Sequence, residues 1–180
     1  MAWTSPMTAV TGNVHTAAQF NTGWRDNMLV SEAAVATTAG RFLVTDAARS
    51  IIERTPLVAF TAGGDSTNSA TYTTLAVDTS VAANIGQYVL ISFGGQVSTD
   101  TAGLGARISV DISGSTNQVA VDTNSFYAES GNANDAHQGT WTTIITSLNP
   151  GLMLFSLRYR TTAGGGTSSF NRRLLTVTSF

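Results

Sequence analysis

The side chains that most often carry out chemistry are scarce in this sequence and lie far apart. His15 and His137 are the only histidines, and the chain has no cysteine. A metal site in a protein needs three or four converging ligands. The two histidines therefore indicate loop or capping residues, and we expect neither a metal nor a cofactor.

Hydrolytic sites are equally hard to assemble from these residues. No G-x-S-x-G turn is present to position a nucleophilic serine. Asp111 and Asp122 have the chemistry of a glycosidase carboxylate pair, but their surroundings predict solvent-facing residues of a strand and a turn. The oxygen-rich stretch 122–139 lacks the spacing of a calcium loop, and the glycine-rich stretch 162–171 predicts a hairpin turn rather than a phosphate cradle. The sequence therefore predicts a protein that is not an enzyme.

The composition is that of a folded chain with little charge. Hydrophobic residues make up 42% of the chain and charged residues 11%, whereas disordered chains combine high charge with low hydrophobicity. The net charge is −2, and all nine basic residues are arginines. Arg172 and Arg173 form the one adjacent basic pair, so we expect no nucleic-acid binding, which needs a concentrated basic face.

Membrane and export signals are also missing from the sequence pattern. No apolar run approaches the roughly 18 residues that a membrane-spanning helix needs, so we expect no membrane insertion. The opening residues lack the basic and apolar regions of a secretory signal. We therefore expect synthesis in the cytoplasm, with any exterior location reached by assembly or by cell lysis.

Residues 1–40 predict an extended arm followed by a short helix. Thr16 opens a T-x-x-Q capping box, so the helix is expected to begin directly after it. Phe20, Trp24 and Met28 then recur every four residues and form one apolar stripe on the helix surface.

This stripe predicts an anchor on another chain, because a short helix ahead of a complete β domain has no core of its own. Tryptophan and arginine are favoured anchors in protein interfaces. The alternative is packing of the stripe against the arm or the β domain of the same chain. The predicted anchor residues are Trp3, Pro6, Phe20, Trp24, Arg25 and Met28.

Residues 41–56 predict a linker hairpin with arms at 42–45 and 50–54. Apolar residues alternate in the first arm as they do in a strand. A short helix in the second half of the segment is the alternative interpretation. Pro56 then marks the boundary to the next part of the chain.

Residues 57–180 predict a mainly β domain, an antiparallel sandwich of jelly-roll type. Short stretches of alternating apolar residues are separated by turns rich in glycine and asparagine, the pattern of sandwiches and barrels. The expected strands are 57–61, 71–77, 87–93, 106–113, 118–121, 140–147, 153–161 and 172–178.

Three stretches resemble virion proteins of phages that infect Actinobacteria. TAAQFNTGWRDNMLV at 16–30, with WTSP at 3–6, is similar to an N-terminal motif of their tail and head-fibre proteins. AGRFLVTDAARSIIER at 39–54 resembles a linker hairpin of phage fibres. LFSLRYRTTAGGGTSSFNRRLLTV at 154–177 resembles the closing hairpin of their β-sandwich domains. The resemblance implies a virion component that forms a homotrimer. The last strand ends in Phe180, an apolar residue that is unfavourable in water and that a subunit interface would bury. We therefore expect the trimer interface at Phe155, Tyr159, Leu175 and Phe180.

The resemblance also implies a location and a set of partners. We expect a capsid decoration protein, of the minor capsid or head-fibre type, attached by residues 1–40 to the major capsid protein or another virion protein. The absence of a coiled-coil or collagen-like shaft favours a compact knob on the outer surface of the capsid over a long tail fibre. The alternative is a tail-associated fibre or a receptor-binding protein that takes a host surface glycan. Phe126, Tyr127 or Trp141 would then be the stacking platform.

Overall fold

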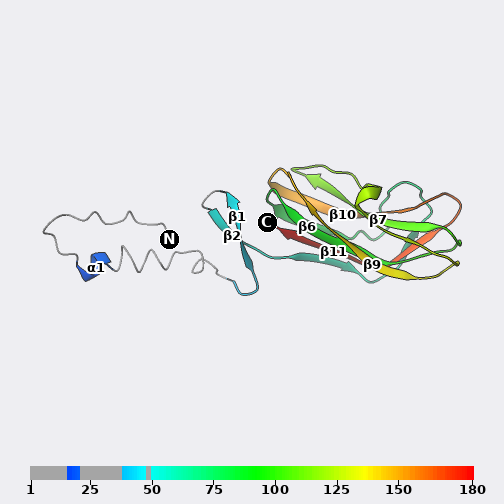
Figure 1. Ribbon diagram of the computed structural model, residues 1–180, viewed down its shortest axis with the longest axis horizontal. Coiled ribbons are helices and arrows are strands. Elements are labelled where there is room, and N and C mark those ends of the chain that lie inside the picture. The colour runs from blue at the N-terminus through cyan, green and yellow to red at the C-terminus, as the bar shows by residue number, and fades with distance from the viewer. Residues whose placement is uncertain (1–15, 21–37, 48–49) are drawn as a thin grey trace. The chain divides into compact units, whose positions relative to one another are not determined.

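A computed structural model describes residues 16–20, 38–47 and 50–180 (Figure 1). The chain divides into two compact units, Met1–Thr55 and Pro56–Phe180. The division falls directly before Pro56, the residue that marks the boundary expected from the sequence. Each unit is described separately below.

The first unit contains a helical turn and a hairpin. Helix α1, Ala17–Phe20, begins directly after Thr16, as the capping box predicts. Strands β1, Phe42–Ala47, and β2, Ser50–Arg54, pair antiparallel with Phe42 opposite Arg54. This pairing confirms the hairpin and rules out the alternative helix. The rest of the predicted anchor helix lies outside the described residues.

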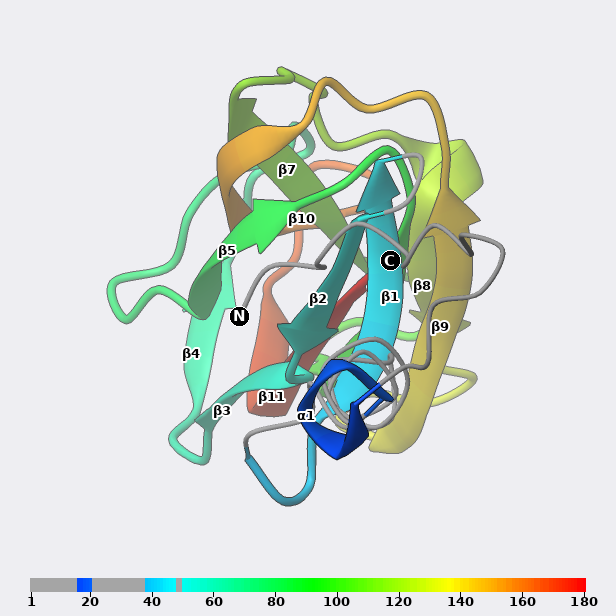
Figure 2. The same cartoon turned by 90° about the vertical axis from the view of Figure 1, so that its left-hand side faces the viewer.

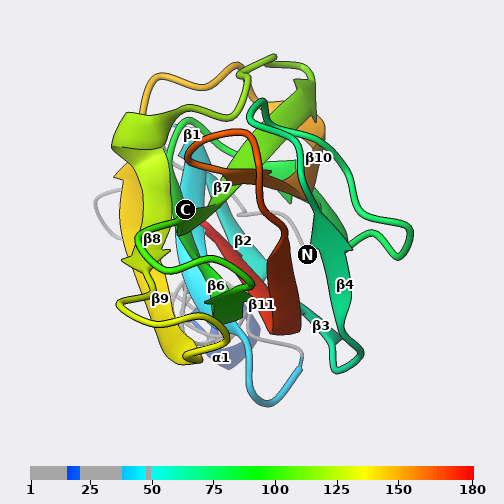
Figure 3. The same ribbon diagram turned by 90° about the vertical axis from the view of Figure 1, so that its right-hand side faces the viewer.

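The second unit is an antiparallel β-sandwich, which confirms the predicted fold class. One sheet has the strand order β5-β10-β7-β8, and the other has the order β3-β11-β6-β9 with β4 also pairing with β11. Figures 2 and 3 view the sandwich from its two ends, and Figure 3 shows β10 and β7 in one layer and β11 and β6 in the other. The strands are β3 Leu57–Thr61, β4 Asp65–Thr67, β5 Ser80–Ile85, β6 Val89–Thr99, β7 Gly105–Gly114, β8 Ser125–Glu129, β9 His137–Ile145, β10 Gly151–Thr161 and β11 Ser168–Ser179.

The connections give this sandwich its jelly-roll character. From β5 onward, every step along the chain except β7 to β8 passes from one sheet to the other. Strands that exchange sheets in this way close both layers around one core. The chain enters and leaves the sandwich at one end, because Leu57 at the start of β3 pairs with Val177 near the end of β11. Loops 100–104, 130–136 and 162–167 gather at the opposite end, where Gly103 N donates to Ser130 O at 2.8 Å and Asp100 N to Thr167 O at 3.1 Å.

The core lies between the sheets and follows the predicted alternation. On β10, Met153 and Leu157 are buried, whereas Leu152 and Leu154 on the opposite face are 63% and 42% exposed. The alternation is needed because successive side chains of a strand point to opposite faces of the sheet. Within the described part of the chain, all buried core residues come from the second unit, so the sandwich closes its own core.

Three of the four predicted trimer-interface residues lie in the core of the sandwich and not on its surface. Phe155, Tyr159 and Leu175 are each 0% exposed and point into the core of the sandwich. A side chain without exposed surface in one protomer cannot contact a second copy that docks onto this domain. Phe180 is the one member of the set that retains surface, at 39% exposure.

Several strands differ from the predicted ones. The stretch 71–77 is irregular and makes only a bridge between Thr73 and Tyr159, and 118–121 makes only a bridge between Gln118 and Ile112. Strands β4, β5 and β8 were not predicted. Strand β5 is built from Ser, Ala and Asn as well as Val and Ile, so its strand conformation comes from packing against β10 rather than from intrinsic propensity.

A β-bulge in β11 sets which residues enter the core. The register against β6 shifts between Asn171 and Leu174, and Arg172 lies in the left-handed region with φ 48°. Before the bulge Phe170 points inward, and after it Arg173 and Leu175 point inward. A Cβ on Gly95, across from the bulge, would lie 2.8 Å from the Asn171 carbonyl oxygen. Glycine is therefore required there for the two backbones to approach.

Candidate functional site

Of the six predicted anchor residues, only Phe20 lies in the described part of the chain. Phe20 ends helix α1, but nothing is described of its side chain. Trp3, Pro6, Trp24, Arg25 and Met28 lie outside the described residues. The attachment surface therefore remains a prediction from the sequence.

The described residues contain no cluster with the chemistry of a metal site. Among them, no group of three or more His, Asp or Glu residues converges as metal ligands. None of the described helices is both long and apolar enough to cross a membrane. Chemistry in this part of the molecule must therefore be sought in smaller groups of polar residues.

Asp111 and Asp122 are each held by an arginine on the outer face of the β5-β10-β7-β8 sheet. Arg158 Nε donates to Asp111 Oδ2 at 2.6 Å. Arg160 forms a two-point contact with Asp122, through Nε to Oδ1 at 3.0 Å and through Nη2 to Oδ2. Both carboxylates are therefore engaged in ion pairs with arginines of β10.

The electrostatics of Asp122 also indicate a carboxylate that is held by its neighbours. Its pKa lies below the ordinary value, chiefly because of the hydrogen bond from Arg160 and also because Tyr72 Oη donates to it at 3.0 Å. Arg107 adds a third contact, at 3.7 Å from Asp122 Oδ2. The Asp122 cluster, defined as Asp122 with Tyr72, Arg107 and Arg160, fastens the turn after residue 121 to the sheet.

Replacing Asp122 with asparagine should lower the free energy of unfolding at pH 7 by about 0.5–1 kcal/mol, a modest amount because the carboxylate is half-exposed. A depressed pKa in the folded state stabilises the fold above the unfolded pKa of about 3.9 and loses that effect as the pH falls through the folded value. Urea unfolding at pH 7 and pH 3 should therefore show a difference at pH 7 that shrinks at pH 3. Asp135→Asn, outside the cluster, is the control, and a difference that does not change with pH would contradict the assignment.

The three predicted glycan platforms are already engaged within the sandwich. The Arg107 guanidinium lies 4.4 Å above the centre of the Tyr127 ring. Trp141 Nε1 donates to Asn124 Oδ1 at 3.0 Å, and Phe126 is partly buried against the core. Tyr127 and Trp141 nevertheless remain 42% and 40% exposed, so their role as glycan platforms stays a prediction from the sequence.

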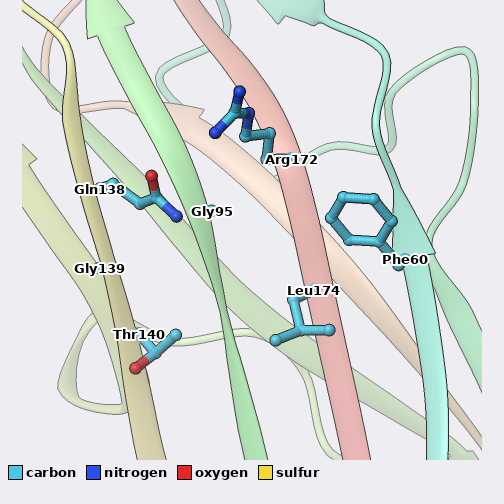
Figure 4. A pocket seen from close by; sticks show the side chains of 7 residues that line it. All are labelled: Phe60, Gly95, Gln138, Gly139, Thr140, Arg172 and Leu174. Atoms are coloured by element: carbon cyan, nitrogen blue, oxygen red, sulfur yellow. The ribbon is translucent and has the colours of Figure 1, made fainter.

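A hollow of about 390 Å³ lies on the outer face of the other sheet (Figure 4). It is lined by residues of four neighbouring strands, β3, β11, β6 and β9. We call it the Arg172 pocket, and its lining residues are Phe60, Gly95, Gln138, Gly139, Thr140, Arg172 and Leu174.

The floor of the Arg172 pocket is main chain. Gly95 of β6 pairs directly with Gly139 of β9, and both glycines line the hollow with main-chain atoms. Phe60 and Leu174, which pair across β3 and β11, form one wall. Gln138 and Thr140 of β9 form the opposite wall, and Arg172 lies at one end of the hollow (Figure 4).

Arg172 differs from the other arginines of the sandwich. Arg107, Arg158 and Arg160 each form an ion pair, and buried Arg173 donates to Val77 O at 2.9 Å. Arg172 is exposed, and among the described residues it has neither an ion pair nor a side-chain hydrogen bond. Its charge is therefore available to a ligand.

Sequence reasoning did not find this pocket. Phe60, Gln138 and Thr140 belong to no motif in the sequence, and Arg172 stands out there only as half of a basic pair. One signal was present: two consecutive glycines inside the apolar run VLISFGGQVST. Glycine in the interior of a strand often marks a bulge or a close approach of backbones.

Comparisons with known proteins identify no family. No family model matches the chain, and no curated protein matches it. The chain is similar to solved structures of infectious bursal disease virus. For its T=1 particles the TM-score is 0.45 at 15% identity, covering 76% of this chain and 35% of that chain. For the Gx strain virus the TM-score is 0.39 at 18% identity, covering 73% of this chain and 35% of that chain. For the VP2 subviral particle the TM-score is 0.38 at 15% identity, covering 76% of this chain and 37% of that chain. The chain thus spans little more than a third of the length of these proteins, and similarity at this level carries no argument about function.

Proposed function

We propose that this protein is a non-enzymatic structural component of a bacteriophage virion, a trimeric capsid decoration protein attached through residues 1–40. Its partner is the major capsid protein or another virion protein, on the outer surface of the particle. The observation that carries the proposal is the independence of the sandwich. Among the described residues its core lies wholly within the second unit, which leaves residues 1–40, with their predicted apolar stripe, to serve as an attachment segment.

The proposed mechanism is surface complementarity without a chemical step. A buried aromatic side chain covers about 150–250 Å², which at about 25 cal/mol per Å² contributes roughly 4–6 kcal/mol before the costs of association. Trp3, Phe20 and Trp24 would supply this contribution. A trimer presents three such segments together, and multivalent attachment raises the effective affinity without new contacts.

Removal of residues 1–40 tests the attachment. We expect the shortened protein to stay soluble and trimeric but to lose its association with particles that lack the native protein. Co-sedimentation with such particles and light scattering measure the two properties. In the full chain, Trp24→Ala should weaken co-sedimentation, whereas Leu152→Ala, an exposed residue of the sandwich, should not. Undiminished association of the shortened protein would refute the proposal.

The second candidate is a tail-associated or receptor-binding protein that recognises a host surface glycan. The Arg172 pocket favours this candidate, because it combines an exposed aromatic ring, an unpaired cation and polar side chains. Glycan recognition and particle attachment use different parts of the chain. Both properties are therefore compatible with one virion protein.

A further inference from the structure

We infer that the Arg172 pocket binds an acidic saccharide, a sugar ring that carries a carboxylate. The inference deepens the glycan-binding candidate above and rests on it, but not on how the protein is attached. Its basis is a combination of three features in one hollow: an unpaired guanidinium, an exposed aromatic wall and a wall of neutral hydrogen-bonding groups.

The charge of the pocket selects for an anion. Arg172 is the one charged residue that lines it, and no aspartate or glutamate is among the lining residues. A guanidinium offers two parallel N–H donors that match the two oxygens of a carboxylate. Each of the other arginines of the sandwich already donates a hydrogen bond to an oxygen of this chain. Arg172 donates none from its side chain among the described residues, so an incoming carboxylate finds an unengaged guanidinium at this end of the hollow.

The walls select for a sugar ring. Phe60 is 60% exposed and stands beside Leu174 (Figure 4). The C–H face of a pyranose is apolar, so it can pack on such a ring while its hydroxyl groups project sideways. Gln138 and Thr140 stand across the glycine floor and offer both donors and acceptors. The volume, about 390 Å³, is at the lower end of the range of small-molecule sites, which suits one or two sugar units.

The backbone at Arg172 gives a further reason to ascribe a role to its side chain. The bulge requires a left-handed residue, with φ 48° at this position. Glycine or asparagine adopts this conformation with less strain than arginine. The bulge therefore explains the backbone and Gly95 but not the presence of an arginine. A strained residue with an unpaired charge at the edge of a hollow is a candidate for ligand binding.

Titration of the full-length protein tests the inference. Sodium D-glucuronate, D-glucose and sodium acetate are the three probes, followed by saturation-transfer and chemical-shift NMR. We expect glucuronate to bind at least tenfold more tightly than glucose, which lacks the charge, and than acetate, which lacks the ring. Arg172→Asn, which keeps a residue tolerant of positive φ, should weaken glucuronate binding at least tenfold.

Two further variants test whether the aromatic wall of the pocket contributes to binding. Phe60→Ala should weaken both glucuronate and glucose several-fold, because it removes the stacking surface from both. Val58→Ala is the matched control: Val58 is 61% exposed on the same strand but does not line the pocket, so binding should stay within twofold. Thermal unfolding of each variant verifies that the fold is retained.

Equal affinity for acetate and glucuronate would overturn the inference in favour of a simple anion contact. Equal affinity for glucose and glucuronate, no binding of glucuronate, or binding unaffected by Arg172→Asn would also overturn it. These results leave particle attachment untouched, since that property is measured by co-sedimentation and depends on residues 1–40. Conversely, loss of attachment in the shortened protein says nothing about glucuronate binding.

Discussion

Replacing Phe155 with alanine is expected to lower the free energy of unfolding by about 3–5 kcal/mol, the usual cost of removing a buried phenylalanine ring. Phe155 is 0% exposed at the centre of β10, opposite Val81 of β5 and Ile112 of β7. The closely packed core cannot fill the space that the ring leaves. Urea unfolding followed by tryptophan fluorescence should show a lower midpoint with an unchanged slope.

The same experiment decides between a core and an interface position for this residue. A core residue destabilises each protomer, so the loss should not depend on protein concentration. Leu154→Ala is the neighbouring control: Leu154 points to the outer face and is 42% exposed, so its loss should stay below about 1 kcal/mol. A Phe155→Ala loss that disappears at high protein concentration would restore the interface assignment.

Replacing Arg173 with alanine is expected to lower the free energy of unfolding by about 3 kcal/mol. Arg173 is 1% exposed, and its guanidinium donates to Val77 O at 2.9 Å and to Gly63 O at 3.4 Å. It also lies 5.6 Å from the centre of the Tyr159 ring. Hydrogen bonds from a charged donor contribute about 1.5–3 kcal/mol each, and the variant loses two of them together with packing against the ring.

The adjacent arginine is a close control for this prediction. Arg172→Ala removes the same side chain from an exposed site and leaves a non-glycine residue at positive φ, so the change should stay within about 0.5 kcal/mol. Arg173→Met restores much of the volume without the donors. We expect it to recover part of the loss, and the part that remains measures the two hydrogen bonds. Equal effects of Arg172→Ala and Arg173→Ala would show that the buried position has no special role.

The sequence predicted the elements whose patterns are strong. The alternation in 153–161 matches β10, and the paired arms of the linker match the β1–β2 hairpin. Strand β5 was missed because packing in the sandwich, rather than propensity, holds its Ala, Ser and Asn residues in strand conformation. Burial of Arg173 was not predictable from composition, since arginine is rarely fully buried and its direction depends on the bulge at Arg172.

The candidate site was beyond the sequence for a different reason. The Arg172 pocket joins Phe60, Thr140 and Arg172 from strands that are distant in the chain. Their proximity follows from the order β3-β11-β6-β9, and periodicity predicts strands but not which strands become neighbours. The predicted trimer-interface set failed in part for a related reason. The apolar residues on one face of β10 do share a buried face, as the alternation predicts, but the second sheet of the same protomer covers that face.

The entry and exit of the chain at one end of the sandwich have a mechanical consequence. Tension applied between Leu57 and Val177, which are paired neighbours, peels β3 from β11 one hydrogen bond at a time. Tension applied between Leu57 and the loops at the far end instead loads the β3–β11 ladder in shear, so that its bonds resist together. The domain should therefore resist a force applied between Leu57 and the far loops much better than a force applied between Leu57 and Val177.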